Sequence, residues 1–284
     1  MLLRENAPLR EYCSMRVGGP ARLAAFPETA EELAALLRAG GRRVVLGGGS
    51  NVLFPDEGYD GTVIFTTRLC GLTADGCMLS AQAGVPLSAA ARRALECGLG
   101  GLAFAYGIPG TVGGGVYMNA GAYGGQIADC LVRATLLDAA GEPRVVPASE
   151  LALGYRSSAL MDGDWTLLSA DFALVPAPPE EIRAEMERNM QARREKQPLE
   201  LPSAGSVFKR PEGYFAGTLI EQCGLKGFAV GGACVSEKHA GFIVNKGGAT
   251  CADVEALIRA VQDTVFQATG VELEPEIRRI SLSE

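Results

Sequence analysis

The stretch that decides the fold runs from Ile108 to Gly125 and reads Ile-Pro-Gly-Thr-Val-Gly-Gly-Gly-Val-Tyr-Met-Asn-Ala-Gly-Ala-Tyr-Gly-Gly. Seven of its eighteen residues are glycine, and none is charged. Glycine gives up side-chain packing and loses the most backbone entropy on ordering, so a dense run is kept where main-chain N–H groups must approach a ligand closely. Phosphate is the usual ligand of such a segment. The run therefore predicts a phosphate-binding loop.

A second, shorter glycine run comes earlier in the chain. Gly47, Gly48, Gly49, Ser50 and Asn51 follow the apolar segment 43–46, and this order is typical of a strand that ends in an anion-binding turn. Either run alone is also compatible with a flexible or tight loop. Two runs, each placed after an apolar segment, favour a long cofactor that carries a diphosphate.

Length and composition bound the class of protein. The chain has 284 residues, of which 48% are apolar, so two or three subdomains with an ample core are expected. No segment approaches the ~18 uninterrupted apolar residues of a membrane span. The first residues lack the basic-then-apolar pattern of a secretion signal, which predicts a cytoplasmic protein. No pattern in the chain predicts an oligomeric state.

The net charge of −7 argues against a nucleic-acid partner. An anionic small ligand would therefore need local positive charge, for which Lys196, Lys209 and Arg210 are candidates.

The eight cysteines and the single histidine argue against metal chemistry. No two cysteines have the spacing Cys-x-x-Cys, and one histidine gives no credible zinc or haem site, so no metal is expected. The cysteines are expected to be reduced residues of the core. His239 has no histidine partner, which favours a hydrogen-bonded loop or strand residue over a catalytic base.

Apolar periodicity predicts a mixture of helices and strands after an irregular N-terminal arm. Helices are expected at 28–38, 86–97, 180–196, 215–223 and 252–268. Strands are expected at 43–46, 62–66, 78–83, 131–137, 144–146, 167–175, 241–245 and 277–280. Thr29 and Glu32 have capping-box spacing at the first helix. Pro176, Pro178 and Pro179 mark the expected boundary before a compact C-terminal α+β unit.

Three familiar site patterns are absent or misplaced. Residues 98–103 match the Gly-x-Gly-x-x-Ala fingerprint, but they follow a predicted helix and not a strand, so Gly98 is expected to be a helix C-cap. The chain contains neither a Gly-x-x-x-x-Gly-Lys-Ser/Thr loop nor a Gly-x-Ser-x-Gly elbow.

Three further residues stand in patterns that admit a chemical role and an ordinary one. Arg156 lies between polar residues after an apolar stretch, and it is either a surface arginine or a ligand for a carboxylate. Ser206 lies in a loop of small residues before two cations, and it is either a loop or cap serine or a reactive group. Glu276 enters an apolar terminal strand, as a solvated edge residue or as an acid held close to a site.

Five motifs at these residues, in order and over nearly the whole chain, resemble the UDP-N-acetylenolpyruvoylglucosamine reductases. They are Gly-Gly-Gly-Ser-Asn at 47–51, Ile-Pro-Gly-Thr-Val-Gly-Gly with Met-Asn-Ala-Gly-Ala-Tyr-Gly in 108–124, Gly-Tyr-Arg-Ser-Ser at 154–158, Ala-Gly-Ser-Val-Phe-Lys-Arg-Pro at 204–211 and Leu-Glu-Pro-Glu-Ile-Arg at 273–278. The short interval between Arg156 and Ser206 resembles the shorter class of this family, which lacks an inserted loop whose tyrosine closes over the substrate diphosphate.

The resemblance implies an α+β chain. Its FAD-binding fold would be of the vanillyl-alcohol-oxidase type, in two subdomains at 1–67 and 68–176, followed by a UDP-sugar substrate domain at 177–284. It implies noncovalent FAD, NADPH as co-substrate and a UDP-sugar as substrate. The expected reaction reduces the enolpyruvyl group of UDP-N-acetylglucosamine enolpyruvate to UDP-N-acetylmuramate, a step of peptidoglycan precursor synthesis.

The resemblance also implies roles for single residues. The family's serine acid falls on Ser206, its arginine on Arg156 and its glutamate on Glu276. Cofactor contacts fall on Gly47, Gly48, Gly49, Ser50, Asn51, Pro109, Gly110, Thr111, Gly113, Gly114 and Asn119. Substrate contacts fall on Tyr123, Lys196 and Arg278. Arg210 and His239 stand where the longer class of the family has asparagine and glutamine.

Two other functions share part of this pattern. A flavin-dependent oxidase of an alcohol or hydroxy acid would have the same fold and glycine turns, without a need for Arg156, Ser206 and Glu276. A noncatalytic nucleotide-binding protein would keep the turns and show no turnover. Reaction of the reduced flavin with oxygen would distinguish the oxidase.

Overall fold

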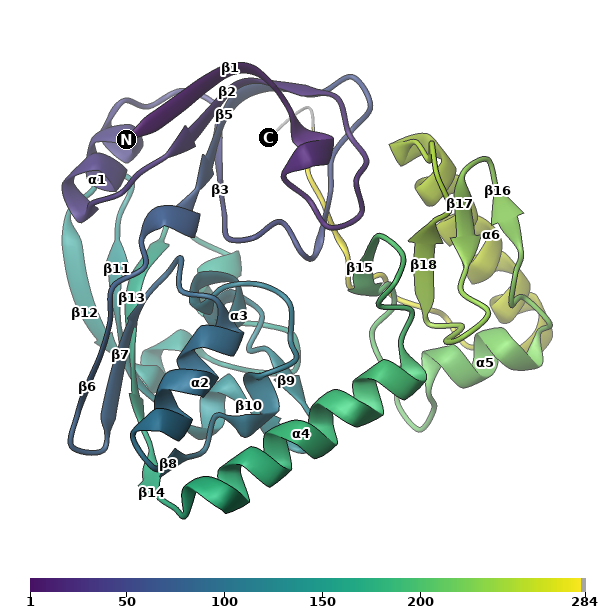
Figure 1. The fold of residues 1–284 in the computed structure, drawn as a ribbon. Coiled ribbons are helices and arrows are strands. Elements are labelled where there is room, and N and C mark those ends of the chain that lie inside the picture. The colour runs from purple at the N-terminus through teal and green to yellow at the C-terminus, as the bar shows by residue number, and fades with distance from the viewer. Residues whose placement is uncertain (282–284) are drawn as a thin grey trace. The chain divides into compact units, whose positions relative to one another are not determined.

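The computed structural model describes residues 1–281, which form two compact units (Figure 1). Unit 1 consists of Met1–Arg4, Leu23–Gly48 and Gly61–Arg193, and unit 2 consists of Glu5–Arg22, Gly49–Asp60 and Arg194–Glu284. The first glycine run is thereby divided, because Gly48 ends a segment of unit 1 and Gly49 begins a segment of unit 2. The three-part division at residues 67 and 176 stays a prediction.

The first sheet consists mostly of residues from unit 1 and includes the N-terminal residues of the chain. Its strands β1 (Leu2–Pro8), β2 (Pro20–Phe26), β5 (Tyr59–Phe65) and β3 (Arg43–Leu46) pair in the order β1-β2-β5-β3. The expectation of an irregular N-terminal arm is wrong. Most side chains of β1 are exposed, so this edge strand carries no alternation of apolar and polar residues from which it could be predicted.

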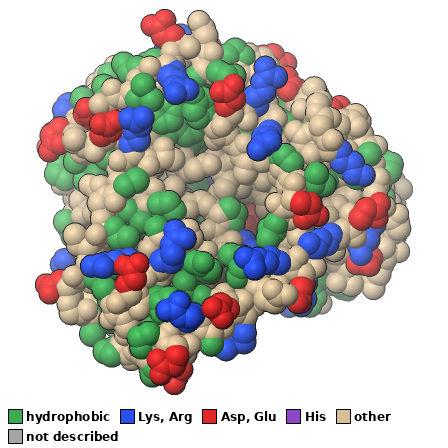
Figure 2. All heavy atoms as spheres, viewed as in Figure 1, with side chains coloured by type: hydrophobic (Ala, Val, Ile, Leu, Met, Phe, Trp, Pro, Cys, Tyr) green, Lys and Arg blue, Asp and Glu red, His purple; other side chains and the backbone are tan. Residues whose placement is uncertain are grey.

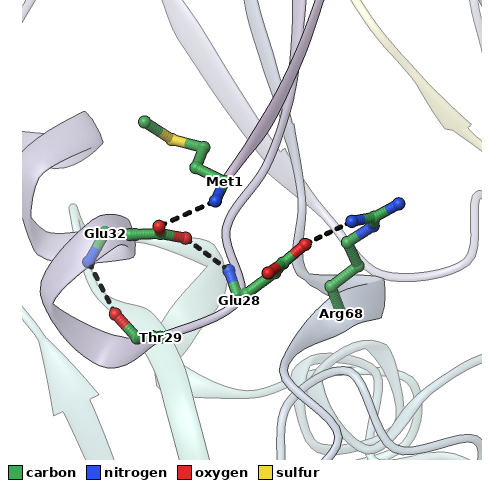
Figure 3. A network of polar contacts seen from close by, with 5 residues as sticks. All are labelled: Met1, Glu28, Thr29, Glu32 and Arg68. Carbon is green, nitrogen blue, oxygen red and sulfur yellow. Dashed lines mark hydrogen bonds and ion pairs between the residues drawn. The ribbon is translucent and has the colours of Figure 1, made fainter.

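Helix α1 (Ala30–Arg38) packs on this sheet through Leu33 and Leu37. Its first turn is held by a polar network (Figure 3), in which the Thr29 hydroxyl accepts from the N–H of Glu32 at 3.2 Å. The Glu32 carboxylate accepts from the N–H of Glu28 at 2.8 Å and from the Met1 ammonium at 2.7 Å. Arg68 pairs with Glu28. The predicted N-cap at Thr29 is therefore confirmed.

The second sheet of unit 1 is antiparallel and has the strand order β12-β11-β13-β7-β6. Its strands are β6 (Leu72–Asp75), β7 (Met78–Gln82), β11 (Leu131–Leu137), β12 (Pro143–Pro147) and β13 (Thr166–Ala173). Helices α2 (Leu87–Glu96) and α3 (Val112–Tyr117) pack on this sheet (Figure 1), and Val112, Val116 and Phe172 are fully buried in the shared core.

Helix α3 lies inside the segment 108–125, so this glycine segment is not loop throughout. The two buried valines, one helical turn apart, provide its apolar face. Three consecutive glycines between them obscure that pattern in the sequence.

The remaining regular elements of unit 1 are short, apart from α4 (Pro179–Lys196), of which Arg193 is the last residue in this unit. The short strands β8 (Leu99–Gly100) and β14 (Val175–Pro176) pair with each other, as do β9 (Gly121–Ala122) and β10 (Gly125–Gln126). Short 3₁₀ helices lie at Leu9–Glu11 in unit 2 and at Thr66–Arg68, Ala103–Ala105, Ile127–Asp129, Ala148–Leu151 and Ala159–Met161 in unit 1. Gly98 has a φ of 65° directly after α2, as expected of a residue that ends a helix.

Unit 2 is built on an antiparallel sheet with the strand order β15-β18-β17-β16, next to α5 and α6 (Figure 1). The elements are β15 (Ser203–Ser206), α5 (Ala216–Gln222), β16 (Ala229–Val230), β17 (Ala233–Val235), β18 (Phe242–Asn245) and α6 (Cys251–Thr269). A second, parallel pair joins β19 (Arg278–Arg279) to β4 (Val52–Leu53). This pair brings the end of the described chain beside residues that follow the first glycine run.

Helix α6 shows how local sequence sets an element of unit 2. Thr250 and Asp253 form a capping box, and Gly270, with a φ of 72°, ends the helix. The buried stripe consists of Val254, Leu257, Ile258, Val261 and Val265. This stripe has helical spacing and packs in the core of unit 2. Outside the N-terminal arm and α3, the other predicted helices and strands are present with ends that shift by a few residues.

All eight cysteines are free thiols. The expectation that they are core residues holds for Cys13, Cys130, Cys234 and Cys251 and is wrong for Cys70, Cys77 and Cys97, which are exposed. Over residues 1–281, no helix has the length and apolar character needed to cross a bilayer.

Replacement of Thr250 by alanine tests the cap of α6. We expect the variant to lose about 1 kcal/mol of the free energy of unfolding, because the N–H of Asp253 loses its acceptor. Urea unfolding followed by circular dichroism measures the loss. Thr264→Ala is the matched control, because this hydroxyl bonds only to the carbonyl of Ala260 within the same helix and its removal should change the value by less than about 0.5 kcal/mol. Equal losses in both variants would contradict the capping role.

Candidate active site

Residues of the two glycine runs lie close to each other in unit 1. A Cβ on Gly47 would lie 2.2 Å from the Thr111 Oγ1, and one on Gly48 would lie 3.7 Å from the Gly110 Cα. Only glycine fits at position 47. The Thr111 hydroxyl is buried and has no hydrogen-bond partner within residues 1–281. The end of β3 and the start of α3 therefore form one continuous surface of backbone.

Gly114 is the glycine of α3 that packing within the chain does not explain. A Cβ on Gly113 would lie 3.1 Å from the Ala83 carbonyl oxygen, and one on Gly115 would lie 3.1 Å from a methyl of Leu87. Among residues 1–281, a Cβ on Gly114 would meet nothing within 4 Å. Glycine inside a helix costs about 1 kcal/mol relative to alanine, so the open space beside Gly114 fits a bound group.

Two main-chain N–H groups at the start of α3 bond within the protein, and one of them belongs to Gly113, a predicted cofactor contact. The N–H of Val112 donates to the Val85 carbonyl and that of Gly113 to the Ala83 carbonyl, both at 2.8 Å. A cofactor contact of Gly113, if it forms, therefore involves its Cα and not its N–H. Gly110 keeps a φ of 120° that favours glycine at the turn before α3.

The second half of the first glycine run belongs to unit 2. A Cβ on Gly49, which has a φ of 63°, would lie 2.2 Å from the Tyr12 carbonyl oxygen. The Ser50 carbonyl accepts from the Ser14 hydroxyl at 3.3 Å. The Asn51 side-chain amide donates to the Glu276 carbonyl at 3.1 Å. This half of the turn thus anchors the segment before β19, which carries the predicted catalytic residue Glu276.

Arg156 lies at the tip of a tight turn in unit 1. Gly154 and Ser157 exchange both main-chain hydrogen bonds across the turn, at 3.1 and 3.3 Å, and Arg156 has a φ of 54°. Its guanidinium donates to the Gly121 carbonyl at 3.3 Å and lies over the Tyr155 ring. The Ser158 hydroxyl fixes the end of the turn by donating to the Tyr117 carbonyl at 2.7 Å.

Asn119 connects the glycine segment to the Arg156 turn. Its side chain is buried, donates to the Gly154 carbonyl at 2.9 Å and to Gln126 at 3.1 Å, and accepts from the N–H of Ala128 at 2.9 Å. Its predicted contact with a cofactor stays a prediction. The structure shows a residue that holds Arg156 in place.

Asn119, Tyr123 and Arg156 all have left-handed backbones, with φ values of 42°, 53° and 54°. Such conformations cost roughly 1–3 kcal/mol in a residue with a side chain and persist where the surroundings enforce them. Three predicted site residues of unit 1 therefore carry backbone strain, which is common at functional sites.

Ser206 and Glu276 lie on adjoining segments of unit 2. The N–H of Glu276 donates to the Val207 carbonyl at 2.7 Å, and Phe208 forms a bridge with Pro275. The Ser206 hydroxyl donates to the Phe208 carbonyl at 3.2 Å. The structure thus places side by side the two backbone segments that carry Ser206 and Glu276, which are far apart in the sequence.

His239 lies beside the same segment. A Cβ on Gly241 would lie 3.5 Å from the Ser206 Oγ and 3.0 Å from the His239 Cε1. The His239 Nδ1 accepts from the N–H of Gly241 at 3.1 Å, so this nitrogen carries no proton. Burial lowers the pKa of His239 below its ordinary value, and the nearby Lys226 ammonium lowers it further. The expectation of a hydrogen-bonded histidine is confirmed.

The cations around Ser206 are engaged within unit 2. The Lys209 ammonium pairs with Glu274 at 2.5 Å. Arg210 lies 3.9 Å over the Phe215 ring and donates to the Tyr214 carbonyl at 3.3 Å. Lys196, at the end of α4, and Arg278, in β19, are exposed. No group of three or more His, Cys, Asp or Glu residues in the described part of the chain has the arrangement of a metal site.

Comparison with known proteins assigns the family. Residues 197–280 match the model of the UDP-N-acetylenolpyruvoylglucosamine reductase C-terminal domain, and residues 21–146 match that of an FAD-binding domain. The reductase of this name from Caldicellulosiruptor bescii is 47% identical over 97% of this chain and 90% of its own length. That from Agathobacter rectalis is 47% identical over 98% of this chain and 94% of its own.

The chain belongs to the UDP-N-acetylenolpyruvoylglucosamine reductase family. A solved structure of UDP-N-acetylenolpyruvylglucosamine reductase from Thermus caldophilus matches it with a TM-score of 0.88 and 37% identity, over 99% of this chain and all of that one. The resemblance seen in the sequence and the expected α+β fold with an FAD-binding domain are confirmed.

FAD is therefore the cofactor, and the geometry of unit 1 fits it. The approach of Gly47 and Gly48 to Gly110 and Thr111 exposes backbone without side chains, as a diphosphate requires. The unpaired Thr111 hydroxyl and the open space at Gly114 are two features that the chain alone leaves unexplained.

Two polar residues of α4, Asn189 and Arg193, were not among the site residues predicted from the sequence. They continue the spacing of the buried residues Ile182 and Met186 along one face of the helix. Arg193 is 9% exposed. The sequence carried a usable indication, because a polar pair at core-facing positions of a helical stripe is unusual.

Gly114→Ala tests the cofactor surface. We expect FAD to bind roughly 10-fold more weakly or worse, because the added methyl occupies space that the flavin needs, and overpacking costs about 1–3 kcal/mol. Fluorescence of released flavin measures the dissociation constant. Without FAD, the variant should be as stable as the wild type or more stable, since alanine favours the helix. A variant that loses stability without FAD would contradict this assignment of the open space.

The lowered pKa of His239 gives a second test. His239 is the only histidine, so NMR of the histidine ring gives one titration, and its midpoint should lie below the ordinary 6.5. The unfolded chain then binds the proton more readily than the folded chain. The free energy of unfolding should therefore fall as pH drops from about 6.5 toward the folded pKa. His239→Gln should remove this part of the pH dependence, and a midpoint above 6.5 would contradict it.

Proposed function

We propose that Arg156, Ser206 and Glu276 carry the chemistry of this family's reaction. As a UDP-N-acetylenolpyruvoylglucosamine reductase, the chain is an FAD-dependent oxidoreductase that reduces the enolpyruvyl group of its UDP-sugar to give UDP-N-acetylmuramate, with NADPH as the source of electrons. FAD, when bound, supplies hydride to the methylene carbon of the enolpyruvyl group. Binding of the carboxylate, stabilisation of charge and protonation are left to side chains.

The pairing of the Ser206 segment with the Glu276 segment is the observation that carries this proposal. Main-chain hydrogen bonds join Glu276 to Val207 at 2.7 Å and Lys209 to Glu274 at 2.8 Å. Asn51 adds a third bond, to the Glu276 carbonyl. Two potential proton-bearing groups are thus fixed on neighbouring stretches of backbone, which is the preorganisation that acid catalysis needs.

Ser206 is the proton donor in this proposal. Its hydroxyl is bordered by Gly205, with a φ of 78°, and by Gly241 on the paired strand, so neither neighbour adds a side chain beside it. Serine is a weak acid and can donate only to a strongly basic acceptor. The carbon that bears the substrate carboxylate becomes such an acceptor once hydride has reached the neighbouring methylene carbon.

Arg156 and Glu276 stabilise the charge that develops at the carboxylate end of the substrate. A guanidinium is always protonated and matches a carboxylate in geometry. The strained turn of Arg156, with its bonds to Gly121 and from Asn119 to Gly154, holds the cation before substrate binds. A protonated Glu276 would add a hydrogen bond to the same oxygens, and such terms reach several kcal/mol where water is excluded.

The substrate contacts and the cellular setting are further parts of the proposal. Tyr123, Lys196 and Arg278 are exposed and carry a hydroxyl or a positive charge, as contacts to a UDP-sugar require. Free thiols at all eight cysteines and the net charge of −7 support a cytoplasmic location without nucleic-acid or membrane partners. On the face drawn in Figure 2, Lys and Arg side chains lie among Asp and Glu side chains and form no continuous basic patch.

Ser206→Ala tests the assignment of the donor. We expect reoxidation of the reduced flavin by the enolpyruvyl UDP-sugar to slow by roughly 10²- to 10⁴-fold, the usual contribution of a positioned acid, while reduction by NADPH persists. Anaerobic stopped-flow absorbance separates the two half-reactions. Wild-type product formed in deuterium oxide should carry deuterium at the carbon that bears the carboxylate.

Ser203→Ala, in the same strand, is the matched control and should leave both rates within a few-fold. Ser206→Cys should recover part of the rate, because a thiol can also donate. A Ser206→Ala enzyme that reduces the sugar within a few-fold of the wild-type rate would show that another group is the donor. Reoxidation by oxygen but not by the sugar in the wild type would instead indicate the oxidase.

A further inference from the structure

The stripe of α4 changes from apolar to polar residues within one face of the helix. Ile182, Met186, Asn189 and Arg193 follow one another at spacings of four, three and four residues, which places them on one side of the helix. The first two belong to the apolar core of unit 1. The Asn189 Nδ2 and the Arg193 Nε are buried and have no hydrogen-bond partner within residues 1–281.

Arg193 is a buried cation without a counter-ion in the described part of the chain. None of the ion pairs formed by residues 1–281 includes it. Burial lowers the pKa of its guanidinium, and its side-chain hydrogen bond with Tyr123 opposes that shift. An uncompensated buried charge destabilises a fold by several kcal/mol. An anion bound beside Arg193 would remove that penalty.

The neighbours of Arg193 point to the source of such an anion. A Cβ on Gly107 would lie 3.1 Å from the Arg193 Cδ and 3.2 Å from its Nε, so the arginine lies against main chain directly before the segment 108–125. Its hydrogen-bond partner Tyr123 belongs to that segment and is 46% exposed. A ligand can therefore reach the pair from the side of Tyr123.

We propose that Arg193, with Tyr123 and Asn189, binds the diphosphate that NADPH and the UDP-sugar have in common. The proposal rests on the proposed function, in which the two molecules react with the same flavin in turn. The glycine runs at Gly47 and Thr111 already provide a backbone surface for the diphosphate of FAD. A guanidinium presents forked donors that match phosphate oxygens, and the amide of Asn189 adds neutral donors beside it.

The test measures binding of UDP and of NADP⁺ to the FAD-loaded protein, each followed by the change in flavin absorbance and by calorimetry. Arg193→Met should weaken the binding of both probes by roughly 10- to 100-fold, the worth of a charge-assisted hydrogen bond, with FAD content unchanged. Arg193→Lys should recover part of the affinity. Arg188→Met, an exposed residue of the same helix, removes the same charge and should leave both affinities within about two-fold.

Tyr123→Phe gives an independent variant, because this exposed side chain is not part of the core and its hydroxyl holds Arg193. This variant should bind both probes several-fold more weakly. Unchanged affinities in Arg193→Met and Tyr123→Phe would overturn the proposal. So would weaker binding of only one of the two probes, or a loss of bound FAD with both affinities unchanged. These measurements need no turnover. Failure of the proposed function would appear separately, as a wild-type flavin that the enolpyruvyl UDP-sugar does not reoxidise.

Discussion

The close approach of Gly47 to Thr111 is the constraint on which the cofactor half of unit 1 depends. The 2.2 Å between a hypothetical Cβ and the Thr111 hydroxyl leaves room for hydrogen only. The surrounding bonds enforce this contact from both sides. Thr66 donates to the Leu46 carbonyl at the end of β3, and Val112 and Gly113 donate to carbonyls of the strand and turn before α2. Sheet, turn and helix are thus fixed around a surface of bare backbone, which is what a diphosphate needs.

The position of Arg156 is likewise fixed by the hydrogen bonds around it. A long cationic side chain at a turn would ordinarily sample many conformations, and the entropy lost on binding a carboxylate would weaken the interaction. Two side chains fix the turn that carries Arg156: Asn119 donates to the Gly154 carbonyl, and Ser158 donates to the Tyr117 carbonyl of the glycine segment. The strain in the left-handed residues Asn119 and Arg156 is therefore the cost of presenting a charge in one place. The glycine segment and the turn that carries Arg156 are thus joined by side-chain hydrogen bonds.

The sequence predicted the elements whose apolar pattern is visible and missed those whose pattern is hidden. Helix α6 can be predicted from its capping box and apolar stripe. In contrast, β1 is exposed on most of its length, and α3 has three glycines between its two valines. The roles of Ser206, Arg156 and Glu276 came from motif resemblance, because no periodicity relates residues that far apart. The pairing of the Ser206 segment with the Glu276 segment in unit 2 depends on main-chain contacts that only a structure shows. Asn189 and Arg193 escaped notice because a charged helix was interpreted as a solvated one.

Three lysines of unit 2 lie against carboxylates. The sequence pointed to Lys209, but its ammonium pairs with Glu274 at 2.5 Å, and Lys226 and Lys238 likewise lie against Glu221 and Glu200. Such partly exposed pairs contribute about 1 kcal/mol or less, and salt screens them. In a chain of net charge −7, a phosphate is held best by a cation that no carboxylate neutralises and that water does not screen. Arg193 meets both conditions within the described residues.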